Sequence, residues 1–240
     1  MLNSIMNFIL PKVCIICKKF ISDKNIPLCN ECFKKIKFIN SNYCVKCGIV
    51  LNYGGEHCYE CLKSNRKKFY EYLRSVCVYD GVIKDIIHLF KYSNKEYLYT
   101  FLGDLMVEYI KKEQNFLNVD LIVPVPLHWY KKFQRSYNQS DLLTKYIAKK
   151  LNMKFELNNL YRKKFTKSQT KLNREKRIKN VRGVFDIKNP DEFDKRKILL
   201  IDDVTTTGAT LNECAWILKK AGASKIYGLT LARDCYTVNF

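Results

Sequence analysis

Two spacings of hydrophobic residues alternate along most of the chain. Short apolar runs at 75–79, 119–125, 198–201 and 225–231 have the length and composition of buried strands. Between them, apolar residues recur every three or four positions at 82–90, 98–110, 138–151 and 210–220, as in amphipathic helices. Strands that alternate with helices predict an α/β fold, a mostly parallel sheet with helices on both faces.

The region before residue 69 has a different pattern, in which cysteines take the place of hydrophobic runs. Four pairs, each with two intervening residues, lie 11, 11 and 10 residues apart: Cys14 and Cys17, Cys29 and Cys32, Cys44 and Cys47, Cys58 and Cys61. Two such pairs make the tetrahedral four-sulfur site that suits Zn²⁺, whereas disulfides need an oxidising compartment. We therefore predict two structural zinc ions, with sequential pairing favoured and crossed pairing still open.

These patterns divide the chain into two expected domains. Residues 1–68 would form a double zinc ribbon with a short N-terminal helix, and residues 69–240 the α/β domain. So short a first segment buries little apolar surface, so the metal must supply much of its folding free energy. Gly48 directly follows Cys47, at a knuckle position that often needs a positive φ.

Composition and charge narrow the classes of function. With 47% hydrophobic residues among 240, the chain is not disordered, and no apolar run is long enough to span a bilayer, so we expect a cytoplasmic protein without membrane insertion. The net charge is +20, and residues 129–186 alone carry 17 basic and 4 acidic side chains. Such a segment indicates a polyanionic partner, the alternative being a solvated lysine-rich face.

The stretch 198–210 carries the clearest chemistry. Its aliphatic strand leads into Asp202 and Asp203, and a hydroxyl-rich turn then enters a helix. Backbone N–H groups and the helix dipole at that N-terminus attract a phosphate, with a glycine allowing close approach. Carboxylates do not bind phosphate, but they accept hydrogen bonds from a sugar diol with its associated Mg²⁺. The predicted phosphate-binding residues are Thr205, Thr206, Thr207, Gly208, Ala209 and Thr210.

This block resembles the phosphoribosyl pyrophosphate signature of type I phosphoribosyltransferases, and neither a Rossmann nor a P-loop glycine pattern occurs. The resemblance implies that Asp202 and Asp203 hold the ribose hydroxyls and that residues 205–210 hold the 5-phosphate. Purine-salvage members that act on 6-oxopurines have an aspartate base where this chain has Thr206. That departure argues against hypoxanthine or guanine as the acceptor.

Further landmarks lie outside this block. They are Phe90-Lys91-Tyr92, Pro124-Val125-Pro126-Leu127-His128, Arg135, Tyr137, Asn138, Gln139, Arg162, Thr166, Gln169, Leu172, Arg177, Asn180 and Phe185. Together with the cysteine-rich front, they resemble the ComF family of competence-associated proteins, which pair a double zinc ribbon with a phosphoribosyltransferase domain. The resemblance covers nearly the whole chain. It departs at Ser136, where the family usually has glycine.

The resemblance also implies roles for single residues. Pro124, Val125 and Arg135 would contact the pyrophosphate, while Arg177 and His128 would assist catalysis, although a histidine after such a turn is often a surface residue. Lys91 would face the cleft, unless it is a helix-end lysine that reaches solvent. A basic hood, about 157–186, would close over the reacting centre.

Two functional interpretations follow. In one, the protein is a phosphoribosyltransferase of unknown acceptor that binds phosphoribosyl pyrophosphate with Mg²⁺, in a family associated with natural transformation and single-stranded DNA uptake. In the other, the pocket is kept without turnover, in a ligand-gated single-stranded DNA-binding or regulatory module. Other DNA-uptake proteins are expected partners in both.

Overall fold

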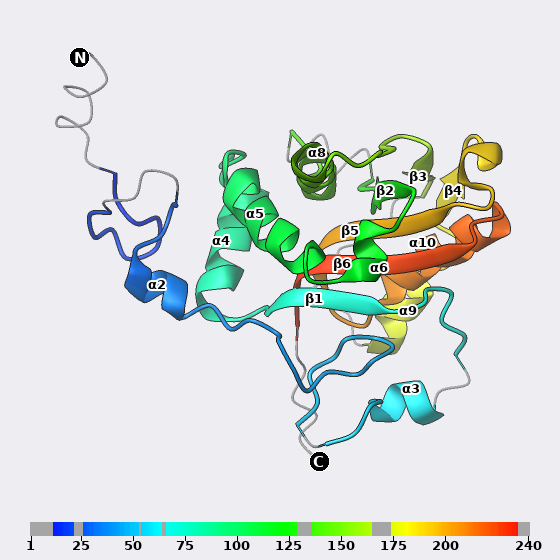
Figure 1. Cartoon of the computed structure of the whole chain (residues 1–240), viewed down its shortest axis with the longest axis horizontal. Helices are drawn as coiled ribbons and strands as arrows, with labels where there is room; N and C mark the ends of the chain where they lie inside the picture. Colours follow the sequence, from blue (N-terminus) through cyan, green and yellow to red (C-terminus); the bar gives the residue numbers. More distant parts are fainter. Residues whose placement is uncertain are drawn as a thin grey trace.

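A four-stranded parallel sheet forms the centre of the protein, as the computed structural model shows for residues 12–21, 26–52, 54–63, 66–128, 136–164 and 174–234 (Figure 1). The strands lie in the order β1 (Leu73–Val78), β6 (Lys225–Arg233), β5 (Lys197–Thr205) and β2 (Leu121–Pro124). Every neighbouring pair is parallel. The expected α/β fold is confirmed, with each predicted strand in this sheet.

Helices cover both faces of the sheet, because alternate residues of each strand point to opposite sides. Leu199, Ile201 and Leu229 belong to a hydrophobic cluster shared with α4 (Gly81–Tyr92), α5 (Leu98–Ile110) and α8 (Gln139–Leu151). Leu200 and Ile226 belong to a second cluster, shared with α10 (Ala209–Lys220). The short helices α6 (Gln114–Leu117) and η2 (Pro190–Phe193) lie in connections.

Strand β5 is longer than its aliphatic run. It continues through both aspartates to Thr205, because Asp202 and Thr205 still pair with Thr230 and Arg233 of β6. Asp202 and Asp203 therefore lie among the last residues of a paired strand and not in the turn that follows it. Their positions are fixed by the sheet.

The segment predicted as a hood contains a small antiparallel pair and a helix. Strands β3 (Leu160–Arg162) and β4 (Phe185–Ile187) pair with each other, and α9 (Arg174–Val181) precedes β4. Helix α10 contacts both α9 and β4. This part of the chain thus packs on the α10 face of the sheet.

The two cysteine-rich segments meet the sheet domain at different places. In the first, with α2 (Asn30–Lys34), the ring of Phe33 lies 6.3 Å from that of Phe101 on α5. In the second, with α3 (Tyr59–Lys63), the carbonyl of Lys46 accepts a hydrogen bond from the amide of Leu73 on β1 at 3.0 Å. Figure 1 accordingly shows α2 beside α4 and α3 beyond β1. The expected N-terminal helix lies outside the described residues, and the domain boundary stays a prediction.

Candidate functional site

A pocket of about 340 Å³ lies where the carboxyl ends of the strands meet the ends of α4, α8 and α10. Ligands of open α/β sheets bind at this edge. The residues that line it are Tyr79, Lys91, Tyr92, Val125, Pro126, Leu127, Asn138, Gln139, Ser140, Arg162, Asp202, Asp203, Val204, Thr205, Thr206, Thr207, Gly208, Ala209, Thr210 and Asp234.

One wall of the pocket is the turn between β5 and α10, residues 205–210. Gly208 caps α10 with φ +72°, a left-handed conformation that glycine adopts without strain. The hydroxyl of Thr207 accepts a hydrogen bond from the amide of Ala209 at 3.3 Å. The amides of Thr207 and Gly208 donate to no other group in the described parts of the chain. A helix N-terminus with such amides suits a phosphate group.

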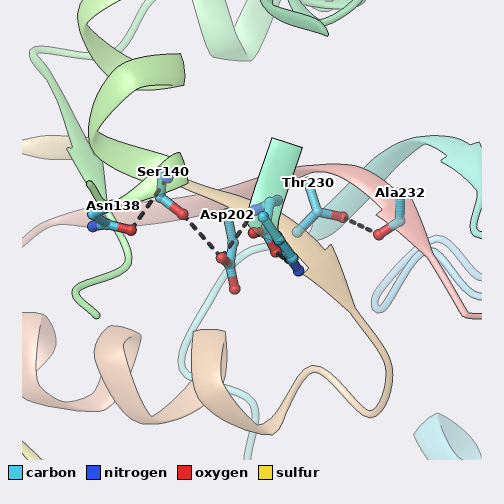
Figure 2. A network of polar contacts seen from close by, with 7 residues as sticks. Asn138, Ser140, Asp202, Thr230 and Ala232 are labelled. Carbon is cyan, nitrogen blue, oxygen red and sulfur yellow. Dashed lines mark hydrogen bonds and ion pairs between the residues drawn. The ribbon is translucent and has the colours of Figure 1, made fainter. Parts of the chain in front are cut away.

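Two adjacent carboxylates form the floor of the pocket, each held by a different partner. Oδ1 of Asp202 accepts from the Ser140 hydroxyl at 3.0 Å and from the Asp203 amide at 2.9 Å. Asn138 caps α8 by accepting from the Ser140 amide, so α8 delivers Ser140 to the aspartate (Figure 2). Asp203 instead accepts from the ammonium group of Lys91 at 2.8 Å, with both side chains less than one-fifth exposed.

These surroundings favour the neutral form of Asp202. Burial, followed by the negative charge of Asp203, raises the pKa of Asp202 to about 7, against the opposing effect of Lys91. Arg162 of β3 also lines the pocket, and burial lowers the pKa of its guanidinium. A guanidinium stays protonated even so. The pocket thus offers both an acceptor pair for hydroxyl groups and a cation for an anionic group.

The structure brings most of the predicted site residues together. Asp202, Asp203, Val125 and residues 205–210 all line the pocket. Pro124 and His128 are not among the lining residues; Pro124 ends β2, and His128 is 4% exposed. Arg135 lies outside the described residues, and only the backbone of Arg177, in α9, is described.

Some pocket residues were not predicted from the sequence. Ser140 and Asp234 belong to no recognisable motif, and their role depends on tertiary contacts. Lys91 had two interpretations, and its ion pair with Asp203 favours the one in which it faces the cleft. The signal that could have found Ser140 is its place two residues after Asn138, in the first turn of a helix that starts at the pocket.

The cysteines form two four-sulfur groups, and the pairing is sequential. In each group all sulfur atoms lie within 4.8 Å of one another: Cys14, Cys17, Cys29 and Cys32 in the first group, and Cys44, Cys47, Cys58 and Cys61 in the second. One sulfur pair in each group is 3.6 Å apart, close to the roughly 3.8 Å expected for tetrahedral zinc with Zn–S bonds of about 2.3 Å. The donor atoms therefore fit Zn²⁺.

The local backbone agrees with metal binding. Gly48 has φ +73°, as predicted, and Lys18 takes φ +64° at the same position of the first knuckle. Both knuckles therefore turn in the same way directly after their second cysteine.

In the described ranges, no helix has both the length and the apolar character needed to cross a bilayer.

Comparisons with known proteins cover both parts of the chain. Residues 5–62 match the double zinc ribbon domain family. Competence protein F of Haemophilus influenzae is 32% identical over 92% of this chain and 96% of its own. The DNA utilization protein YhgH of Escherichia coli K12 is 26% identical over 93% and 97%. Competence protein ComFC of Bacillus subtilis is 28% identical over 86% and 84%.

Solved structures also resemble part of the chain. A purine phosphoribosyltransferase from Pyrococcus horikoshii is 18% identical, with a TM-score of 0.40, over 58% of this chain and 79% of its own. The adenine phosphoribosyltransferase of Trypanosoma brucei is 16% identical, also with a TM-score of 0.40, over 61% and 68%.

Proposed function

Since this chain belongs to the ComF family of competence proteins, we propose that it binds phosphoribosyl pyrophosphate with Mg²⁺ in the pocket beside Asp202 and Asp203. The observation that carries the proposal is that the carboxylate pair and the turn 205–210 line the same pocket. A ligand that uses both must carry hydroxyl groups and a phosphate. A ribose 5-phosphate has this arrangement.

Each part of the ligand has a counterpart in the pocket. Asp202 and Asp203 accept hydrogen bonds from the ribose hydroxyls, and the amides and hydroxyls of residues 205–210 donate to the 5-phosphate. In the proposal, the pyrophosphate passes Val125, which lines the pocket, and the neighbouring Pro124 at the end of β2. Arg135 also contacts the pyrophosphate in the proposal. Mg²⁺ arrives with the pyrophosphate and offsets its charge.

The proposed reaction is transfer of the phosphoribosyl group. An acceptor nucleophile forms a bond to C1 of the ribose while the bond from C1 to the pyrophosphate oxygen breaks, and the electron pair leaves with pyrophosphate. The chain's contribution is positioning, together with positive charge near the leaving group. In the proposal, Arg177 supplies that charge. The reaction would take place in the cytoplasm, where thiols stay reduced.

Ligand binding by the parent protein is the direct test. Phosphoribosyl pyrophosphate with Mg²⁺ should raise the melting temperature, because the ligand binds only the native state. Asp202→Asn with Asp203→Asn should abolish this shift. A matched control, Asp85→Asn with Glu108→Gln, removes two exposed helix carboxylates outside the pocket and should leave it unchanged. An equal shift in all three proteins would refute the assignment of the pocket.

A second candidate function is supported by charge. Residues 129–186 carry a large excess of basic side chains, more than one pyrophosphate can use, and the exposed Lys176 and Lys179 lie on α9. The excess favours contact with single-stranded DNA. In that case the pocket would hold its ligand without turnover and gate DNA binding. Release of pyrophosphate with an added acceptor separates the enzyme from such a module.

A further inference from the structure

The side chain of Arg233 connects the second cysteine group to the turn at the pocket. Arg233 is the last residue of β6 and is 2% exposed. Its Nη1 donates to the carbonyl of Cys47 at 2.7 Å, and its Nη2 donates to the carbonyl of Thr206 at 3.3 Å. One buried guanidinium thus bridges a metal-binding knuckle and the proposed phosphate-binding turn.

The buried charge of Arg233 has no carboxylate partner within the described ranges, where its Nε also lacks a hydrogen bond. Burying a cation is costly unless a negative charge lies close by. A zinc ion with four thiolates carries about −2, because the thiolates outweigh one divalent ion. The loaded second group is therefore the nearby negative charge that this arginine requires.

Other contacts hold the second knuckle firmly against β1. The carbonyl of Val45 accepts from Nη1 of Arg74 at 2.8 Å, in addition to the bond from the Leu73 amide to Lys46. A Cβ on Gly48 would collide with the carbonyl oxygen of Leu73, so the two backbones are in direct contact. The hydroxyl of Tyr70 lies 3.5 Å from where a Cβ on Gly208 would be. The knuckle and the turn consequently share one packed region.

The hydrogen bond from Arg233 to the Thr206 carbonyl also affects the direction of the next amide, that of Thr207. In a trans peptide the C=O and the next N–H point in opposite directions. With the Thr206 carbonyl directed at Arg233, the N–H of Thr207 is directed away from it. That amide has no other partner among the described residues, and Thr207 lines the pocket. The arginine therefore sets the orientation of a proposed phosphate donor.

We propose that Arg233 is a positioning residue that makes ligand binding in the pocket depend on metal in the second cysteine group and not in the first. The first group shares its hydrophobic cluster with α4 and α5, on the other face of the sheet, and no such link to the turn occurs among its described residues. The identity of the ligand in this inference rests on the proposed function. The coupling between the second metal site and the turn 205–210 does not depend on that function.

Hydrogen exchange of residues 205–210 in the full-length protein, read at hydrogen-bonded amides such as that of Ala209, tests the coupling without any ligand. Cys44→Ser, which removes the second metal, should speed exchange in this turn, whereas the matched Cys14→Ser should not. Arg233→Lys keeps the charge but cannot make both bonds, so it should speed exchange in the turn while zinc content stays at two per chain. Unchanged exchange in Arg233→Lys, or equal effects of the two cysteine variants, would overturn the proposal.

Binding of phosphoribosyl pyrophosphate with Mg²⁺ gives a second readout. Loss of one charged hydrogen bond should weaken binding to Arg233→Lys by about tenfold. By reciprocity, the ligand should raise the zinc affinity of the second site in the parent and not in Arg233→Lys, as measured by equilibrium competition with a chelator. If the parent binds no ligand but the exchange results hold, the proposed function fails and the coupling stands. If the parent binds the ligand and both Cys44→Ser and Arg233→Lys bind it equally well, the proposed function stands and only the coupling fails.

Discussion

Asp202 and Asp203 are neighbours in sequence, yet their surroundings differ. Asp203 has an ammonium partner, whereas among the described residues Asp202 accepts hydrogen bonds from a hydroxyl and an amide. Burial and the nearby negative charge of Asp203 therefore favour the neutral form of Asp202. A ribose hydroxyl that donates to Asp202 would favour its ionised form.

The raised pKa of Asp202 predicts a pH-dependent effect of Asp202→Asn on stability. Between about pH 4 and pH 7 the unfolded carboxyl releases its proton while the folded one keeps it, so the parent loses stability as pH rises through this window. Asparagine is neutral throughout. The variant's gain in melting temperature should therefore grow from pH 5 to pH 8 and then level off. A gain independent of pH would contradict the shifted pKa.

At the scale of elements, the turn between β5 and α10 depends on the backbone of Gly208. A Cβ there would meet only ordinary contacts, at 3.4 Å from Leu73 Cδ2 and 3.5 Å from the Tyr70 hydroxyl. The cost of a side chain is therefore the left-handed φ of +72° and not a collision. The turn that enters α10 is thus specified by one glycine.

Gly208→Ala should destabilise the protein by about 1 kcal/mol and also weaken phosphoribosyl pyrophosphate binding, because the turn must shift to relieve the strain. Gly183→Ala is the matched control. Gly183 has φ +66°, also without close neighbours, and lies outside the pocket lining. Denaturant unfolding should show a similar loss in both variants, while calorimetry shows weaker binding in Gly208→Ala only. Unimpaired binding by Gly208→Ala would argue against the turn as the phosphate site.

The elements that the sequence predicted are those with strong local signals. The aliphatic run 198–201 and the cap Asn138 identify β5 and α8 without tertiary information. Strands β3 and β4 have three residues each, too few for a period to appear, and they exist because they pair with each other. The polar end of β5 is likewise held by β6. Contacts such as Ser140 with Asp202 join residues 62 apart and have no local signal.

Across the whole molecule, the two cysteine groups are alike in sequence but not in position. The regular spacing predicts equal sites, and the structure confirms the two sequential groups. Only the hydrophobic and hydrogen-bonded neighbours distinguish them: the first shares a core with α4 and α5, and the second contacts β1 and Arg233. These neighbours come from distant parts of the chain, so the spacing alone carried no information about them.

At the scale of the whole molecule, the uneven charge distribution predicts how DNA binding should depend on salt. If residues 129–186 bind single-stranded DNA, the logarithm of affinity should fall with the logarithm of salt, by about 0.7 for each phosphate neutralised. Replacing Lys163, Lys164, Lys167 and Lys171 with glutamine should flatten that slope, because phosphate contacts are lost. Asp202→Asn with Asp203→Asn should leave it unchanged or strengthen binding, since only negative charge is removed.

A matched variant separates local contacts from net charge. Lys34, Lys35, Lys84 and Lys112 are exposed and lie outside the basic segment, so changing them to glutamine removes the same charge elsewhere. Fluorescence anisotropy with a labelled oligonucleotide at several salt concentrations should show a flatter slope only for the first set. Equal flattening in both sets would mean that net charge alone attracts DNA. No binding even at low salt would exclude the DNA-binding module, and pyrophosphate release with a small acceptor would then identify the protein as an enzyme.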